Sequence, residues 1–160
     1  MLDLEIENKL ENLPYFLGVF ARDTLPDRVN KYPHSLVCNT DEHDEPGTHW
    51  IAICVDENMK GDYFDSYGRQ PLQSEFIFYL VKNAPNGFRW NRTLLQCDSC
   101  VTCGEYCCVY LIARTYKFSH DKFVRYFTNS LTGNDIKIKN IFNWFQWKNP
   151  RQYLKRFFNI

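Results

Sequence analysis

One run of residues restricts the fold more than any other feature of the sequence, because Trp50 to Val55 is continuous and rich in strand-forming side chains. A run without polar alternation predicts a β-strand that is buried on both faces. A turn at residues 58–61 and a second strand at residues 62–65 follow it, and together they predict a β-hairpin. We therefore expect a sheet that contains this hairpin.

Helices are expected before and after the strands. The expected helices cover residues 3–13, 72–85 and 103–116, with two or three more after residue 119, and the expected strands add residues 35–39 and 88–96. The strongest helical pattern begins at Cys103 or Gly104. This order of helix, strands and helices predicts an α+β fold. A length of 160 residues suits a single domain, residues 1–160.

The composition is that of a folded domain. Hydrophobic residues make up 44% of the chain and charged residues 24%, which excludes a disordered tail and a low-complexity array. The longest unbroken apolar run, Cys107 to Ala113, is far shorter than the ~20 residues that a membrane helix needs. The N-terminus lacks the basic start and apolar block of a signal peptide. We therefore expect a soluble, intracellular protein with no membrane partner.

The charge is balanced in total but not along the chain. Up to residue 110 there are 9 Lys and Arg against 17 Asp and Glu, whereas residues 111–160 hold 10 Lys and Arg against Asp121 and Asp135. A neutral total can hide a face that binds polyanions. Aromatic residues lie among the basic ones after residue 136, which suits stacking and phosphate contacts. It equally suits amphipathic helices with rings in the core and charges in water.

Seven cysteines without an export signal favour a metal site or a reactive thiol over a disulfide framework. Four of them have the C-x2-C-x2-C-x3-C spacing of an iron–sulfur loop: Cys97, Cys100, Cys103 and Cys107. However, Cys108 stands where a proline is usual, and the helical pattern directs Cys107 to a core. A zinc site completed by His43 or His120 lacks regular spacing. We therefore expect no metal, and a metal-stabilised nucleic-acid-binding module without catalysis remains an alternative.

A reactive thiol is the stronger interpretation of the same segment. Cys103 is expected in the first turn of a helix, where the helix dipole lowers the pKa of a thiol. Gly104 lets a substrate backbone come close. Such a thiol needs an oriented base, and the candidates are His34, His43, His49 and His120. His49 differs from the others because it lies at the mouth of the buried strand, a stiff place to hold a base.

Two more residues complete a catalytic set with Cys103 and His49. Asp65 ends the second strand of the hairpin, so it can lie beside His49 and accept the second imidazole N–H. Gln96 is expected at the end of a strand, seven residues before Cys103. Its amide can stabilise a developing oxyanion, and losing one such donor typically costs ~3 kcal/mol of transition-state stabilisation.

These residues lie in motifs that resemble the adenovirus-type cysteine endopeptidases (adenain), part of a wider class that includes the SUMO-deconjugating proteases. The motifs lie between residues 13 and 112 and are Pro14-Tyr15-Phe16-Leu17-Gly18, Cys38-Asn39-Thr40, Gly47-Thr48-His49-Trp50, Tyr63-Phe64-Asp65-Ser66-Tyr67-Gly68, and Gln96 followed after six residues by Cys103-Gly104 and Tyr106-Cys107-Cys108. The separation of Gln96 from Cys103 resembles adenain, because the SUMO-protease branch is typically one residue shorter.

The resemblance implies a papain-related fold, with a mixed sheet, the nucleophile on a helix packed beside it and a helical C-terminal part. It implies a thiol endopeptidase with a Cys-His-Asp triad, in which His49 is the base, Asp65 orients it and Cys103 is the nucleophile. Gln96 would be the oxyanion donor. Trp50 and Gly104 would contact substrate, with Trp50 packed beside the imidazole.

The implied substrates are viral or virus-like precursor proteins of the capsid or core, cleaved during virion maturation in the virion or the host nucleus. The wider class also admits an isopeptidase that removes ubiquitin or SUMO-type modifiers. Adenain uses a peptide cofactor that is disulfide-linked to a cysteine upstream of the glutamine. No cysteine lies between Cys54 and Cys97, so we expect no covalent cofactor, although an activating peptide or DNA stays open. Adenovirus enzymes bind DNA, so residues 111–160 are expected to bind it weakly.

Overall fold

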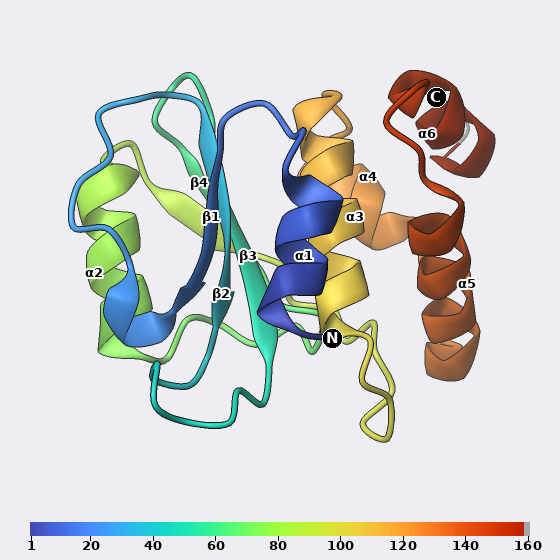
Figure 1. Ribbon diagram of the computed structural model, residues 1–160, viewed down its shortest axis with the longest axis horizontal. Coiled ribbons are helices and arrows are strands. Elements are labelled where there is room, and N and C mark those ends of the chain that lie inside the picture. Colours follow the sequence, from blue (N-terminus) through green and yellow to red (C-terminus); the bar gives the residue numbers. More distant parts are fainter. Residues whose placement is uncertain (159–160) are drawn as a thin grey trace.

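The computed structural model describes residues 1–158 and contains a five-stranded mixed sheet with helices on both faces (Figure 1). The strands are β1 (Phe16–Ala21), β2 (His34–Asn39), β3 (Trp50–Val55), β4 (Gly61–Phe64) and β5 (Phe88–Trp90). They lie side by side in chain order. The two outer pairs are parallel, whereas β2–β3 and β3–β4 are antiparallel. The α+β class predicted from the order of elements is confirmed.

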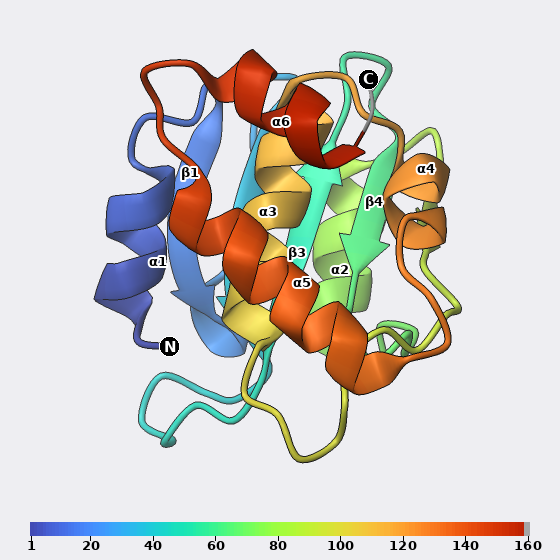
Figure 2. The same cartoon turned by 90° about the vertical axis from the view of Figure 1, so that its right-hand side faces the viewer.

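The helices form layers around the sheet. They are α1 (Asp3–Leu10), α2 (Ser74–Asn83), α3 (Cys103–Thr115), α4 (His120–Arg125), α5 (Leu131–Trp144) and α6 (Pro150–Phe158), and a short 3-10 helix covers Arg22–Thr24. In Figure 1, α2 lies on one face of the sheet, and α1 and α3 lie on the other. Figure 2 shows α5 crossing over α3, with α6 beyond its end. The helix α3 is therefore covered on both sides.

The central strand β3 explains why two apolar layers are needed. Every one of its six residues is buried. Ile51 and Ile53 pack in the core beneath α2, whereas Ala52 and Cys54 pack in the core that includes α3. Because successive side chains of a strand point to opposite faces, one continuous apolar run fills both cores. The prediction of a strand buried on both faces is confirmed.

The helix α3 is the most buried helix of the described chain, since ten of its 13 residues are buried. Cys107 and Cys108 are fully buried among apolar side chains. The helical pattern therefore turns Cys107 into the core, as expected, and away from the cysteines that precede the helix. The four-cysteine iron–sulfur spacing does not assemble into one site.

The predicted strand over residues 88–96 is wrong after Trp90. The chain leaves the sheet there because the amide of Asn91 bonds the backbone of Asp65 and the carbonyl of Thr93. Gln96 consequently lies in a loop, not at a strand end. Two helix boundaries also differ slightly from the predicted ones. The helix α1 ends at Leu10 and not at residue 13, and α2 begins at Ser74 and not at residue 72.

Three helices follow residue 119, within the two or three expected. Among residues 1–158, no helix is both long enough and apolar enough to cross a bilayer.

Candidate active site

His49 and Asp65 meet at one end of the β3–β4 hairpin. His49 directly precedes β3, and Asp65 directly follows β4. Because these strands are antiparallel, the start of one lies beside the end of the other. His49 Nε2 and Asp65 Oδ1 are 2.7 Å apart, and both side chains are buried. The neighbouring positions expected from the hairpin are therefore found.

Asp65 is held from several directions. Its Oδ1 also accepts the backbone N–H of Tyr67 at 2.8 Å. Asn91 accepts the N–H of Asp65 at 3.0 Å and donates to the carbonyl of Asp65 at 2.6 Å. The sequence interpretation missed Asn91, which falls inside a segment with the pattern of a strand. No local pattern marks it, because its partner lies 26 residues away.

Cys103 is the first residue of α3 and is almost completely buried. Burial acts most strongly on its thiol and raises the pKa, but the His49 side chain and the backbone N–H groups of Trp50 and Gly104 outweigh it, so the pKa is lowered. The first N–H groups of a helix have no intrahelical partner, which makes this end of α3 suited to a thiolate. Since Nε2 of His49 binds Asp65, Nδ1 is the ring nitrogen left for the sulfur.

The pKa of His49 is raised to about 9. Burial is the largest influence and lowers it, but the hydrogen bond to Asp65 and the adjacent Cys103 together raise it by more. A lowered thiol pKa beside a raised imidazole pKa favours proton transfer from sulfur to nitrogen. This arrangement therefore favours a thiolate–imidazolium pair.

The side-chain amide of Gln96 belongs to a separate hydrogen-bond network, which includes Ser66, Tyr67 and Cys100. Its Oε1 accepts the hydroxyl of Ser66 at 2.6 Å. Its Nε2 donates to the carbonyl of Cys100 at 2.6 Å and to the hydroxyl of Tyr67 at 3.3 Å. The amide is thus fixed by the loop that leads into α3, and the longer bond to Tyr67 is the weaker of its two donor contacts.

The residues expected to contact substrate have other neighbours here. The indole N–H of Trp50 donates to the carbonyl of Met1 at 3.2 Å. A Cβ on Gly104 would come within 2.7 Å of the Met1 sulfur, so Met1 occupies the space that the glycine leaves. The imidazole ring of His49 packs against the ring of Tyr67, with 4.8 Å between the two ring centroids. The side chain of Trp50 joins the core with α1 and α3, next to Cys103, and its expected packing against the imidazole stays a prediction.

The other three histidines lie elsewhere. His34 bonds the carbonyl of Lys31 and the hydroxyl of Tyr79. His43 pairs with Asp23 on the surface, and His120 bonds Tyr110 in the core. A zinc site that combines the cysteine segment with His43 or His120 is therefore not formed.

Comparison with known proteins found two relatives that are named as proteases. The chain is 29% identical over 111 residues to "Putative thiol protease R355" of Acanthamoeba polyphaga mimivirus, covering 64% of this chain and 35% of the relative. It is 30% identical over 113 residues to the protease of Bovine adenovirus 2, covering 62% of this chain and 55% of the relative. The match thus spans about a third of the length of the mimivirus relative and about half of the length of the adenovirus relative. No family model matches the chain.

Solved structures share the fold. The crystal structure of ASFV pS273R protease has a TM-score of 0.61 and 19% identity, covering 84% of this chain and 63% of that one. The central domain of the uncharacterized protein Lpg1148 from Legionella pneumophila has a TM-score of 0.52 and 13% identity, covering 97% and 98%. At these identities the likeness concerns the fold alone. The sequence matches confirm the resemblance drawn from the motifs: over its matched residues the chain is similar to an adenovirus protease and to a mimivirus thiol protease.

Proposed function

We propose that this protein is a thiol endopeptidase with Cys103 as nucleophile, His49 as base, Asp65 as the residue that orients the base, and Gln96 as an oxyanion donor. The observation that carries the proposal is the hydrogen bond of 2.7 Å between His49 and Asp65 beside the thiol at the start of α3. A thiol, an imidazole and a carboxylate in series form the arrangement that activates a nucleophile. The named relatives support the same reaction class.

The reaction begins from the ion pair. The Cys103 thiolate attacks the carbonyl carbon of the scissile peptide bond, while His49 holds the thiol proton on Nδ1. Asp65 keeps the ring in the orientation that points Nδ1 at the sulfur and stabilises the imidazolium.

The oxyanion that forms needs hydrogen-bond donors in place. The backbone N–H of Cys103 lies in the first turn of α3 and has no intrahelical acceptor. The second donor is Nε2 of Gln96, which reaches the oxyanion by giving up its longer bond to Tyr67. The shorter bond to the Cys100 carbonyl then keeps the amide aimed at the site.

Two proton transfers complete the cycle. His49 protonates the leaving amine, which breaks the peptide bond and leaves an acyl-enzyme on Cys103. His49 then removes a proton from a water that attacks the thioester, and the thiol is regenerated. No further group is needed in this sequence of steps.

We further propose that residues 1–160 form one catalytic domain with a papain-related arrangement. Its substrates would be viral or virus-like precursor proteins of the capsid or core, cleaved during maturation in the virion or host nucleus. Trp50 and Gly104 would contact the substrate after Met1 has moved. The sources of the two named relatives, a mimivirus and an adenovirus, support this substrate class. No covalent cofactor is invoked, and an activating peptide or DNA is part of the proposal.

The deciding experiment is labelling with an electrophilic peptide probe, followed by peptide mapping. We expect modification of Cys103 alone and loss of cleavage in Cys103→Ala. Cys108→Ala, on the same helix and fully buried, is the matched control and should keep the label. Turnover by purified Cys103→Ala would refute the assignment. Peptides with internal glycine sites and ubiquitin-like or SUMO-like conjugates, tested side by side, separate an endopeptidase from an isopeptidase.

A further inference from the structure

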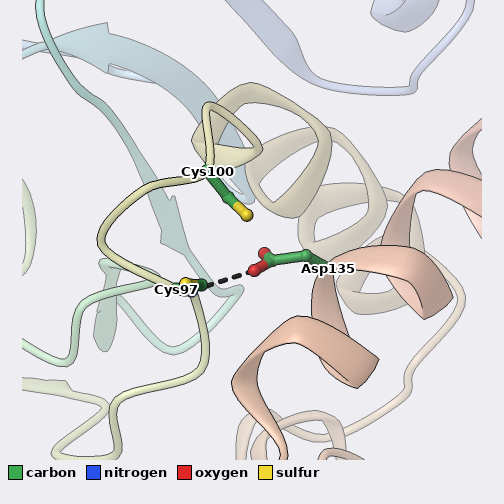
Figure 3. A group of neighbouring side chains, drawn as sticks. All are labelled: Cys97, Cys100 and Asp135. Atoms are coloured by element: carbon green, nitrogen blue, oxygen red, sulfur yellow. Dashed lines mark hydrogen bonds between the residues drawn. The ribbon is translucent and has the colours of Figure 1, made fainter.

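Two cysteines and an aspartate that the proposed reaction does not use meet at a second place (Figure 3). Cys97 and Cys100 lie in the loop before α3, and Asp135 lies in α5. The two sulfur atoms and a carboxylate oxygen all lie within 4.8 Å of one another. Among residues 1–158, no other group of three metal-ligating side chains is this close.

The loop is shaped to present both sulfur atoms together. The backbone N–H of Cys100 donates to the carbonyl of Cys97 at 3.0 Å, so the two cysteines close one tight turn. A C-x2-C pair in such a turn is the usual ligand spacing of protein zinc sites. Both side chains are partly exposed, which leaves a path for an ion and for a water ligand.

Asp135 lacks a positive partner. The residue is 4% exposed, and its carboxylate accepts the Cys97 N–H at 2.9 Å and the Thr102 hydroxyl at 2.5 Å. Within the described part of the chain, no Lys, Arg or His forms an ion pair with it. A buried carboxylate with only neutral donors is costly, and a bound cation would balance its charge. The same two donors hold one oxygen each and so orient the carboxylate.

We propose that Cys97, Cys100 and Asp135 bind a zinc ion, with water as the fourth ligand. Two thiolates select zinc over magnesium or calcium, which prefer oxygen ligands throughout. Zinc–sulfur bonds of about 2.3 Å and zinc–oxygen bonds of about 2.0–2.2 Å would require the three atoms to close by roughly 1 Å. The two thiols release their protons to solvent on binding.

The ion would join two parts of the chain that are far apart in sequence. It would fix the loop between Gln96 and Cys103 to α5, next to the proposed active site but outside its chemistry. This site goes beyond the proposed protease function and beyond the expectation from sequence, which found no metal. Spacing alone could not identify it, because the third ligand follows Cys100 by 35 residues.

The test uses the full chain with Cys103→Ala, so that the proposed catalytic thiol cannot bind the ion. The reduced protein is stripped with a chelator, loaded with Zn²⁺ and analysed for metal content. A second sample is loaded with Co²⁺ and examined by absorption spectroscopy. We expect one ion per chain, and near-ultraviolet charge transfer from two thiolates to tetrahedral Co²⁺. Absence of stoichiometric metal in this reduced parent would overturn the proposal.

Variants of that parent assign the ligands. Cys97→Ser, Cys100→Ser and Asp135→Asn should each lose stoichiometric binding. Thr102→Val, which removes a hydrogen bond that orients Asp135, should weaken affinity about 10–100-fold. Asp98→Asn, an exposed charge in the same loop, should bind like the parent. Unchanged binding in Cys97→Ser or Asp135→Asn would place the ion elsewhere and reject the site. If Asp135→Asn does not fold, Cys100→Ser and the Co²⁺ spectrum of the parent decide.

Discussion

At the scale of single residues, the geometry of the proposed site depends on partners that are far apart in sequence. His49 and Asp65 are 16 residues apart, and Asp65 and Asn91 are 26 apart. The sequence interpretation named His49, Asp65, Gln96 and Cys103, and the hairpin does bring the first two together. Asn91 was missed because an asparagine that bonds distant backbone leaves no periodic signal.

The pH dependence of activity follows from the proposed ion pair. The active form exists above the pKa of Cys103 and below that of His49, so kcat/KM should fall on the alkaline side near pH 9. The acidic limb should lie below the ordinary thiol pKa, because the pKa of Cys103 is lowered. A pH–rate profile with peptide substrate measures both limbs.

The variant Asp65→Asn tests the source of the raised pKa of His49. Without the carboxylate, the alkaline limb should move toward the usual imidazole range, and kcat/KM should fall roughly 10²–10⁴-fold. Asp44→Asn, in an exposed loop, should keep the parent profile. An unchanged alkaline limb in Asp65→Asn would contradict the role of Asp65.

The free energy of unfolding should also depend on pH through the titration of His49. The folded pKa of His49 is raised above its ordinary 6.5 to about 9, so protonated His49 stabilises the fold fully below about pH 6.5. That contribution is lost as the pH rises through about 9. Thermal unfolding across this range, with Asp65→Asn for comparison, measures it. A contribution from His49 that grew with pH would have the wrong sign.

Asn91 is expected to position Asp65 through the backbone. Asn91→Ala removes an acceptor and a donor from the buried peptide groups of Asp65, which should cost about 1–3 kcal/mol of unfolding free energy. The alkaline limb should also move to lower pH, which a purely structural loss would not cause. Urea unfolding and the pH–rate profile test the two effects, with the exposed Asn143→Ala as control.

At the scale of elements, the strands and helices with strong local patterns could be predicted. The strand Trp50–Val55 is found with the predicted bounds, because its run of apolar residues has no other stable placement. The helix from Cys103 was placed within one residue of both ends. The strand expected at residues 88–96 failed because only three of its residues pair with β4. Side-chain hydrogen bonds of Asn91 and Gln96 replace the sheet for the rest.

Because β3 is buried on both faces, truncating one of its side chains should lower the unfolding free energy strongly. Ile53 is fully buried, so Ile53→Ala should lower the unfolding free energy by about 2–5 kcal/mol. Ile136→Ala, at an exposed position of α5, should change it by less than about 0.5 kcal/mol. Chemical denaturation of both variants measures the difference. Equal costs would show that β3 is not central to the core.

At the scale of the whole molecule, ion pairs between the acidic first part and the basic last part of the chain neutralise some of the uneven charge. Arg114 binds Asp62 at 2.6 Å, and Lys117 binds Glu57. These residues are therefore poor candidates for binding a polyanion. Lys148, Arg151 and Lys155, in or next to α6, are exposed. Lys122, Arg125, Lys139 and Arg156 are exposed as well, so most basic residues after residue 111 are accessible to a polyanion. Residues 159–160 of that segment lie outside the described part.

Weak binding of duplex DNA by these exposed basic residues should depend on the salt concentration. Lys148→Gln with Lys155→Gln should reduce the slope of log affinity against log salt concentration by about two, because each phosphate contact contributes ~0.9. Lys60→Gln, an exposed lysine in the β3–β4 turn, is the control. Affinity that does not change with salt would rule out this electrostatic account.

The sequence by itself determined the α+β class, the doubly buried strand, the helix that begins at Cys103, and the position of His49 and Asp65 at one end of a hairpin. Each of these depends on periodicity or on a short turn, which act within a few residues. Only the tertiary structure decided that Asn91 holds Asp65, that Gln96 bonds Cys100 and Tyr67, and that Asp135 joins Cys97 and Cys100. The physical reason is that polar side chains are paired by the packing of distant segments, which no local pattern records.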